Sequence, residues 1–366
     1  MAAKAPQQKK QRHWLSRLSF GTVCLVFCAL LLMSYLSMVL NPAKAWFFTL
    51  FGLLYPLLLL TVLFLLVWAL LRKAKIARTL ALCLLPSLLL AGKFLQLSGS
   101  ADTTPPTLKV VSYNVGLLAH GPQKMDRLAL ADSVCAWLRH TDADVICLQE
   151  FRLPAGQDME KYLRRQFPGY QAEYYVHTGK SSDAGNVTLS RRPIVGKEKI
   201  SFERSTNLAL YTDVQLDSGV LRLYNCHFES YNISLSALVK GLLGDEEEVE
   251  RTGRKMRRSI RERPKQVAEV MKGVDAAPVS SVVLGDFNDT PMSYTCFRLL
   301  RGRKDSFVRA GKGFGATYRS LWPLLRIDYI LYPPELEAVS YEVKKVRYSD
   351  HYPIVASYYE TGRNSR

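Results

Sequence analysis

Residues 282–288 read Val-Val-Leu-Gly-Asp-Phe-Asn, an apolar run that ends in a glycine followed by an acid and an amide. A short run rich in valine predicts a buried β-strand, and the glycine and polar residues predict that the strand ends there. Proteins that alternate strands and helices tend to build their sites at the carboxyl ends of strands. We therefore expect Asp286 and Asn288 to lie in a functional site.

Five other strand-like runs carry an ionisable or amide residue at or near one end. They are 110–114 with Asn114, 145–150 with Glu150, 223–227 with His227, 326–330 with Asp328, and 348–353 with Asp350 and His351. Taken alone, an Asn or Glu after a strand more often caps a turn or helix, and a single His is more often structural. A carboxylate inside the apolar run around Asp328 is costly unless it is paired. Six such cases in one region indicate a shared site.

The residue types in this set suit a hard divalent cation. Asn, Glu and Asp offer oxygen ligands and the cysteines show no metal-ligand spacing, so Mg²⁺ or Mn²⁺ is the expected cofactor. An Asp beside a His fixes the imidazole tautomer and raises its basicity. A cation, imidazoles and amide donors together stabilise the negative charge that develops at a phosphorus under attack. The set therefore indicates metal-assisted hydrolysis of a phosphoester.

The motifs resemble those of the endonuclease/exonuclease/phosphatase superfamily, which includes nucleases, neutral sphingomyelinases and inositol phosphatases. The resemblance runs from about residue 110 to residue 358. Its motifs are Ser-Tyr-Asn at 112–114, Leu-Gln-Glu at 148–150, Asn-Cys-His-Phe at 225–228, Gly-Asp-Phe-Asn at 285–288, Arg-Ile-Asp-Tyr at 326–329 and Ser-Asp-His at 349–351. The resemblance implies an α/β fold with two packed sheets and helices outside, a four-layer α/β/β/α sandwich.

The resemblance also implies roles on the metal side of the site. Glu150 would be the main Mg²⁺ ligand, with Asn114 supporting it. Asp350 would lie near the metal or near a second metal position. Asn186, in the run 185–190, lies where the family has a substrate-facing strand end.

The catalytic side of the implied site has five residues. Asp286 would orient or deprotonate the attacking water, and Asn288 would bind the phosphate. Asp328 would pair with His351, which would contact the scissile phosphate, and His227 would be the second phosphate-facing histidine. Family members differ over the general base, so that assignment stays open.

Departures from the family patterns narrow the function. Apurinic endonucleases often carry an Asp at the position of Gly116 and a Tyr at the position of His227, so a DNA-repair role is disfavoured. The inositol phosphatase pattern around residues 325–328 is absent. Residues 289–294 and 313–318 are similar to bacterial membrane-anchored members, whose substrates the motifs do not fix.

Strand-like and helix-like runs alternate from residue 108 onward. Predicted strands cover 108–115, 144–148, 186–190, 208–216, 220–228, 280–284, 327–331 and 354–359. Predicted helices cover 125–139, 157–166, 234–243, 246–273 and 292–301. Pro264 should break or kink the fourth of these helices. The basic run 251–265 follows an acidic run and reads either as a solvated, ion-paired helix or as an arm near anionic lipid or substrate.

The first hundred residues differ in composition from the rest. Residues 1–100 hold eleven Lys or Arg and no acid, which leaves about +6 of the net charge of +17 for the remainder. Apolar runs at 20–40, 46–71 and 79–97 predict three transmembrane helices. Basic residues before the first run and between the second and third predict a cytoplasmic N-terminus. A cleaved signal peptide is the alternative for the first run.

The expected organisation has five parts: a basic cytoplasmic segment 1–18, three transmembrane helices within 19–98, a linker 99–107, a catalytic domain 108–360 and a tail 361–366. We expect a multi-pass protein of the inner membrane with its catalytic domain on the periplasmic or extracytoplasmic side. The seven cysteines are expected to be free.

The sequence thus favours a membrane-anchored, Mg²⁺-dependent phosphoester hydrolase. Its partners would be the bilayer and a phosphoester substrate, either a lipid headgroup or nucleic acid; no signal sets the oligomeric state. One alternative is a catalytically silent binding module that keeps the fold. Another alternative is a membrane scaffold. Transport is disfavoured, because the apolar runs carry almost no charged residue.

Overall fold

The structure is a computed structural model that describes residues 5–100, 102–121, 125–178, 183–203, 205–231, 240 and 243–361. The chain divides into two compact units. One consists of Met1–Ala91 with Met292–Tyr294, and the other of Gly92–Pro291 with Thr295–Arg366.

The first unit is helical. Its helices are α1 (Ala5–Leu36), α2 (Pro42–Ala45), α3 (Phe48–Leu53), α4 (Tyr55–Leu71) and α5 (Ala77–Leu90). The Tyr35 hydroxyl of α1 lies 2.6 Å from the Ser87 hydroxyl of α5 and donates to the Cys83 carbonyl at 3.1 Å. The predicted apolar runs therefore do form helices that contact one another.

The prediction of three transmembrane helices is wrong for this structure. Within the described residues, no helix combines the length and the apolar character needed to cross a bilayer. A span needs about 20 apolar residues. The second run is divided at Leu54 between α3 and α4, which leaves 17 residues in α4, and α5 has 14. The apolar part of α1 starts after its basic residues and the helix ends at Leu36. The same finding contradicts the expected location as a multi-pass protein of the inner membrane.

The second unit contains two six-stranded sheets. We call the first sheet I. Its strand order is β13 (Leu336–Val343), β14 (Ile354–Glu360), β2 (Leu108–Asn114), β3 (Val145–Arg152), β5 (Asp183–Ser190) and β4 (Gln171–Thr178). Only β2 and β3 pair in parallel, with Asn114 opposite Gln149. The carboxyl ends of these two central strands therefore lie together.

We call the other sheet II. Its strand order is β10 (Lys304–Asp305), β12 (Asp328–Tyr332), β9 (Ser281–Asp286), β8 (Gly219–His227), β7 (Leu208–Leu216) and β6 (Ile194–Ser201). Here β8 and β9 are the parallel pair. Short strands β1 (Leu95–Gln96) and β11 (Gly313–Phe314) form a separate ribbon.

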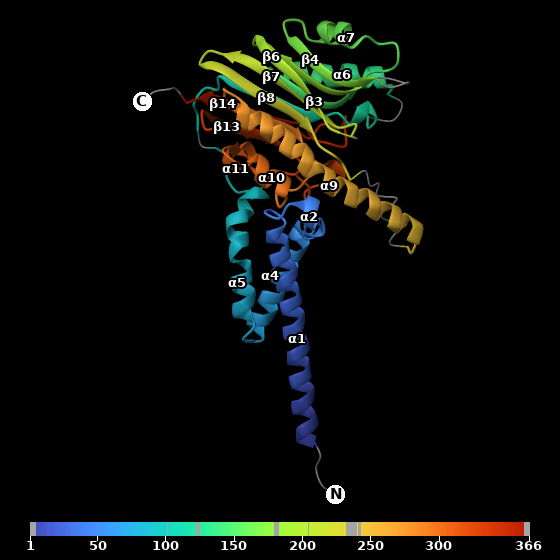
Figure 1. The fold of residues 1–366 in the computed structure, drawn as a ribbon. Coiled ribbons are helices and arrows are strands. Elements are labelled where there is room, and N and C mark those ends of the chain that lie inside the picture. The colour runs from blue at the N-terminus through green and yellow to red at the C-terminus, as the bar shows by residue number, and fades with distance from the viewer. Residues whose placement is uncertain are drawn as a thin grey trace. The chain divides into compact units, whose positions relative to one another are not determined.

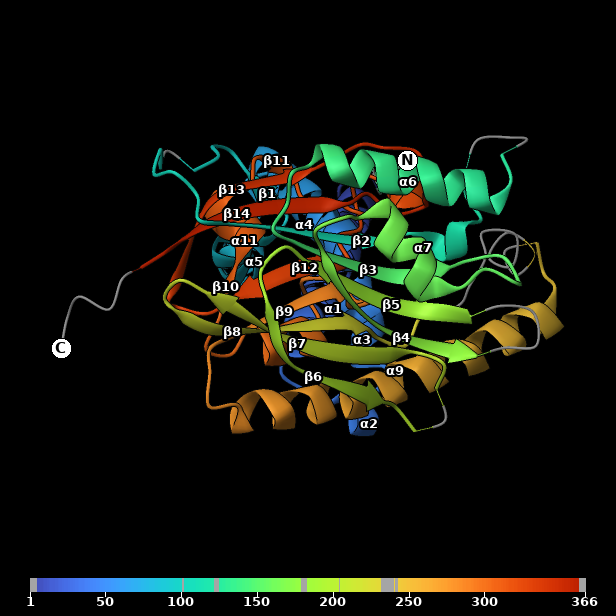
Figure 2. The ribbon, with the colours of Figure 1, turned by 90° about the horizontal axis from the view of Figure 1, so that it is seen from above.

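Helices cover both outer faces of the sheets. Helices α6 (Arg127–His140) and α7 (Met159–Gln166) lie over sheet I, and α9 (Glu246–Ala276) runs along the opposite side under sheet II (Figure 2). Shorter helices are α10 (Tyr294–Leu299), α11 (Ser306–Ala310) and the 3₁₀ turns at Ala91–Lys93, Gly116–Leu118 and Arg319–Leu321. Figure 1 shows the N-terminal part of α9 continuing beyond the sheets.

Three apolar layers hold this sandwich together. Ile146 packs with Val134 of α6 in the outer layer of sheet I, Val110 packs with Leu284 between the sheets, and Val270 of α9 lies in the outer layer of sheet II. Successive strand residues point to opposite faces, so strands that are apolar throughout are buried on both sides. The four-layer α/β/β/α arrangement is confirmed.

Most predicted elements have a counterpart, with instructive exceptions. The prediction was that Pro264 breaks or kinks this helix, and α9 runs through Pro264 as one helix, so a break does not occur. Strands β4, β6 and β13 were not predicted, because they lie at or near sheet edges and lack continuous apolar runs. The predicted helix 234–243 and the tail 361–366 fall largely outside the described residues. All seven cysteines are free, as expected.

Candidate active site

Asp286 lies at the centre of the polar cluster because of strand register. In sheet II, His227 of β8 and Asp328 of β12 are the register partners of Asp286 on its two sides. The preceding Gly285 has φ of +123°, and a Cβ there would lie 2.0 Å from the Cys226 carbonyl oxygen. Only glycine lets β9 approach β8 this closely at its end.

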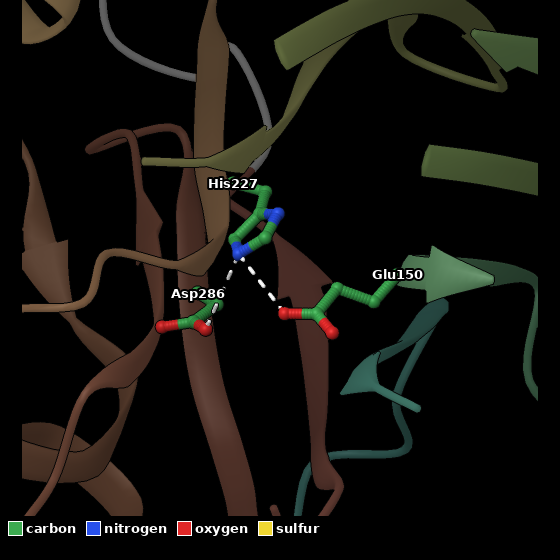
Figure 3. Close-up of side chains that lie close together, drawn as sticks. All are labelled: Glu150, His227 and Asp286. Atoms are coloured by element: carbon green, nitrogen blue, oxygen red, sulfur yellow. Dashed lines mark ion pairs between the residues drawn. The ribbon is translucent and has the colours of Figure 1, made fainter. Parts of the chain in front are cut away.

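Glu150, His227 and Asp286 point toward one another (Figure 3). His227 Nε2 lies 3.3 Å from Glu150 Oε1 and 3.8 Å from Asp286 Oδ2. The Glu150 side chain is 26% exposed and Asp286 only 1%. His227 Nε2 is buried and makes no hydrogen bond to any residue that the structure describes. Glu150 comes from sheet I and the other two from sheet II, so the group joins the two sheets.

Asn114 bridges the two carboxylates of this group. Its side-chain amide donates to Asp286 Oδ2 at 2.8 Å and to Glu150 Oε1 at 3.2 Å. The side-chain oxygen Oδ1 of Asn114 accepts from the backbone N–H of Gly116 at 2.9 Å. The buried amide therefore fixes the distance between the acid from each sheet.

His351 and Asp328 form a tighter pair. His351 Nδ1 lies 2.9 Å from Asp328 Oδ2, and both side chains are almost fully buried. His351 Nε2 faces Asp286 Oδ2 at 3.8 Å. The backbone N–H of Asp328 donates to the Thr317 hydroxyl at 3.2 Å. Because the Asp328 carboxylate accepts from Nδ1, the Nε2 atom is turned toward the centre of the cluster.

Burial and the neighbouring charges shift the pKa values of this pair and its neighbour. Burial lowers the pKa of His351, but the carboxylates of Asp328 and Asp286 outweigh it and raise that pKa to about 10. Burial, opposed by His351 and assisted by Asp328, raises the pKa of Asp286 to about 6. The shifts favour the protonated form of both side chains, which is the imidazolium of His351 and the neutral carboxyl of Asp286, relative to their ordinary behaviour.

Asn288 holds the Asp286 carboxylate in place. Its backbone N–H donates to Asp286 Oδ1 at 2.8 Å, and its side-chain amide donates to Asp286 Oδ2 at 3.1 Å and to the Phe228 carbonyl at 2.9 Å. Asn288 has φ of +51° and Glu150 has φ of +53°. Non-glycine residues in the left-handed region are uncommon and gather at functional sites.

Two of the predicted site residues lie apart from these groups. Asp350 contacts His120, whose Nε2 is 3.6 Å from Asp350 Oδ1, and neither belongs to a potential metal-binding group of the described residues. Asn186 is fully buried between the sheets, where its amide donates to the carbonyls of Leu208 and Asn225 at 3.3 and 3.1 Å.

Residues 111–351, well over half of the chain, match the family described as the Endonuclease/Exonuclease/phosphatase family. The chain belongs to this family. Residues 16–94 match a second family, described as a domain of unknown function (DUF8431). No curated protein matches the chain.

Solved structures of the endonuclease/exonuclease/phosphatase fold resemble this one. An endonuclease/exonuclease/phosphatase from Beutenbergia cavernae is 20% identical with a TM-score of 0.53, over 70% of this chain and 72% of that one. D. rerio TDP2 complexed with a single-strand DNA product is 20% identical with a TM-score of 0.50, over 69% and 98%.

The human Nocturnin catalytic domain with a bound sulfate anion is 15% identical with a TM-score of 0.51, over 71% and 96%. Identities this low show the shared fold. They do not support the membrane-anchored bacterial character expected from the sequence.

The candidate site has a donor set that fits a divalent cation. Glu150, His227 and Asp286 offer ligand atoms within 4.8 Å of one another, and Asp286, Asp328 and His351 do the same. The first group has the unpartnered His227 Nε2, whereas the second is already internally hydrogen-bonded. The first group is therefore the better candidate for holding an ion.

Some residues of this family site escaped sequence reasoning. Thr317 and Ser349 support it: the Ser349 hydroxyl donates to the Asn114 carbonyl at 2.9 Å and accepts the His351 N–H at 3.1 Å. Both lie inside motifs quoted for other reasons. A hydroxyl directly before Asp350 was an available signal for Ser349, and no comparable signal marks Thr317. His120 lies in a loop with no periodic pattern, so nothing in the sequence marks it.

Proposed function

We propose that this protein is a metal-dependent phosphoester hydrolase whose substrate is a phosphodiester. The observation that carries the proposal is the convergence of Glu150, His227 and Asp286 beside the Asp328–His351 pair, from six separate segments of chain counting Asn114. Three carboxylates and two imidazoles at one end of two packed sheets suit phosphoryl chemistry more than structural support.

Glu150, assisted by His227 and by the nearby Asp286 oxygen, would hold Mg²⁺ or Mn²⁺. When bound, such an ion neutralises phosphate oxygens and lowers the pKa of a bound water. The partly exposed Glu150 side chain gives access from solvent, while Asn114 keeps the two acids at a fixed separation.

Asp286 would orient the attacking water and accept its proton, because its pKa of about 6 leaves it ionised yet basic at neutral pH. Asn288 occupies both Asp286 oxygens with N–H donors and so limits the rotation of the carboxylate. The water oxygen forms a bond to phosphorus, and the bond from phosphorus to the alcohol oxygen breaks. The products are a phosphomonoester and an alcohol.

His351 would face a phosphoryl oxygen as a cation, held in orientation by Asp328. An imidazolium aimed from a rigid support stabilises developing negative charge without reorganisation during the reaction. His227, which the sequence predicted as the second phosphate-facing histidine, would instead lie beside the cation, because its Nε2 atom faces Glu150 and Asp286. Asp350 with His120 at the margin would contact more distant parts of the substrate, and we retain buried Asn186 as a support for the strand end behind the site.

The test uses the full chain and two substrate classes. Bis(4-nitrophenyl) phosphate and a single-stranded DNA oligonucleotide should be hydrolysed with Mg²⁺ or Mn²⁺, and EDTA should abolish the activity. A sphingomyelin headgroup assay places lipid phosphodiesters in the same panel. Activity that survives EDTA would contradict the proposal, and failure to hydrolyse any of these substrates would favour the silent binding module.

A further inference from the structure

Helix α9 buries three polar side chains on one face. Ser259, Arg263 and Gln266 are 4%, 1% and 4% exposed. Their spacing of four and three residues places them in one row along the helix. A guanidinium is among the side chains least often fully buried, because desolvation costs several kcal/mol unless it is paired. We therefore expect each of these side chains to have hydrogen-bond or ion-pair partners that offset the cost of desolvation.

All three side chains contact the backbone that directly follows His227. The Ser259 hydroxyl donates to the Ser230 carbonyl at 2.7 Å. Arg263 donates from Nε and Nη2 to the Glu229 carbonyl at 2.9 and 2.7 Å. Gln266 Oε1 accepts the backbone N–H of Glu229 at 2.8 Å. One helix face thus holds the segment that leaves the end of β8.

Arg263 also reaches the segment that leaves the end of β9. Its Nη1 atom lies 3.0 Å from Asp289 Oδ2, and that carboxylate is 4% exposed. Asp289 follows Asn288 directly, and its backbone carbonyl accepts from the Tyr329 hydroxyl at 3.0 Å. One buried guanidinium therefore joins the loop after His227 to the loop that carries Asn288.

The two loops are joined at the active-site end as well. The Phe228 N–H donates to the Asp286 carbonyl at 3.1 Å, and the Asn288 side chain donates to the Phe228 carbonyl at 2.9 Å. These bonds fall within three residues of the contacts that Arg263 makes. A change at Arg263 would be transmitted through one residue, Phe228, to His227 and through two residues to Asp286.

We propose that Arg263 is a positioning residue that sets the separation of the His227 and Asp286 loops, an inference whose catalytic consequence rests on the proposed function. Arg263 is too buried to contact substrate, so it acts through the two loops. Misplacing catalytic groups by about 1 Å costs up to roughly 100-fold in rate. The loss should fall on kcat, because the substrate contacts of the cluster remain.

The chain offers a matched control in another arginine–aspartate ion pair, whose arginine lies on β8, the strand that ends at His227. Arg222 of β8 donates to both Asp213 oxygens at 2.7 and 2.8 Å, and each side chain is 14% exposed. Arg222 is five residues before His227, near the middle of β8. Arg222→Met should lower stability and leave kcat unchanged.

The experiment compares Arg263→Met, Arg263→Lys and Arg222→Met in the full chain. With bis(4-nitrophenyl) phosphate and Mn²⁺, well below the unfolding temperature, Arg263→Met should lower kcat roughly 10- to 100-fold with KM within about 3-fold. Arg263→Lys keeps the charge and should recover part of the loss. Equal kcat losses in Arg263→Met and Arg222→Met would overturn the proposal.

Hydrogen exchange separates this inference from the proposed function. In Arg263→Met, amides of residues 226–231 and 286–291 should exchange at least about 10-fold faster, and in Arg222→Met they should not. Unchanged exchange in these peptides would overturn the positioning role. An inactive wild type would contradict only the proposed function, since exchange still reports on the loops. If Arg263→Met does not fold, Asp289→Asn, which keeps the shape of the partner, is judged by the same two measurements.

Discussion

Two imidazole–carboxylate groups share Asp286 and differ in whether the imidazole is already hydrogen-bonded to a carboxylate. In one, His227 Nε2 approaches Glu150 and Asp286 at 3.3 and 3.8 Å and makes no hydrogen bond. In the other, His351 and Asp328 are buried and bonded at 2.9 Å. The open group has ligand atoms that an ion can use, and the closed group has a fixed orientation. From this difference we propose that the open group binds the cation and that the closed group provides rigid charge stabilisation.

The largest expected effect is loss of activity at the open group. Glu150→Gln should lower metal-dependent hydrolysis by roughly 10³-fold, since it removes an anionic ligand worth several kcal/mol in the transition state. Its thermal stability should change little, because the side chain is partly exposed. Glu160→Gln, an exposed acid on α7, is the control. Wild-type activity in Glu150→Gln would contradict the proposal that the open group, and not the closed group, binds the cation.

At the closed group, one substitution should reduce both activity and stability. Asp328→Asn should lower activity by roughly 10²-fold, because the His351 ring loses the carboxylate that orients it. It should also cost about 1–3 kcal/mol in unfolding free energy, because a buried imidazole loses its charged partner. Steady-state kinetics and urea unfolding measure the two losses. A stable Asp328→Asn variant with only the activity defect would show that the pair is not a structural support.

Much of this contrast was visible in the sequence. The run 282–288 predicted β9 and its polar end, and an acid inside the apolar run at Asp328 predicted a buried partner, because an unpaired carboxylate there is too costly. Sequence could not show which face of its strand Asn186 occupies, and that side chain lies between the sheets. The solvated reading of the basic run suits the pair of Arg254 with Glu250 but not buried Arg263.

The prediction of membrane spans in the N-terminal third was wrong for a different physical reason. Hydropathy counts apolar residues but not the continuity of a helix, and the backbone ends one helix at Leu53 and begins the next at Tyr55. Long-range contacts such as that between Asp350 and His120 also have no local signal. Residues that meet only through tertiary structure are the part that periodicity does not predict.

A smaller effect should come from the cation itself. Mn²⁺ at about 100 times its dissociation constant stabilises the folded state by about 2.7 kcal/mol, which corresponds to a shift of several degrees in Tm. The shift should persist in Asp328→Asn and vanish in Glu150→Gln. Thermal unfolding with and without Mn²⁺ measures it. A shift lost in Asp328→Asn and kept in Glu150→Gln would move the ion to the closed group.

The last prediction concerns the pH dependence of stability in the metal-free protein. The folded-state pKa of His351, about 10, lies above its ordinary value of 6.5, so the stability it contributes is complete below pH 6.5 and is lost as pH rises toward 10. The slope should reach at most about 1.4 kcal/mol per pH unit. Asp328→Asn should flatten it. Urea unfolding in EDTA between pH 6.5 and 9.5 measures the slope, and identical slopes in both proteins would contradict the assigned charge state.

The central claim is that Glu150, His227 and Asp286 hold a divalent cation. Anomalous scattering from crystals of the full chain grown with Mn²⁺ tests it most directly. We predict a peak within about 2.5 Å of a Glu150 carboxylate oxygen, beside His227 and Asp286. A strong peak elsewhere, with none beside Glu150 at saturating Mn²⁺, would contradict the account.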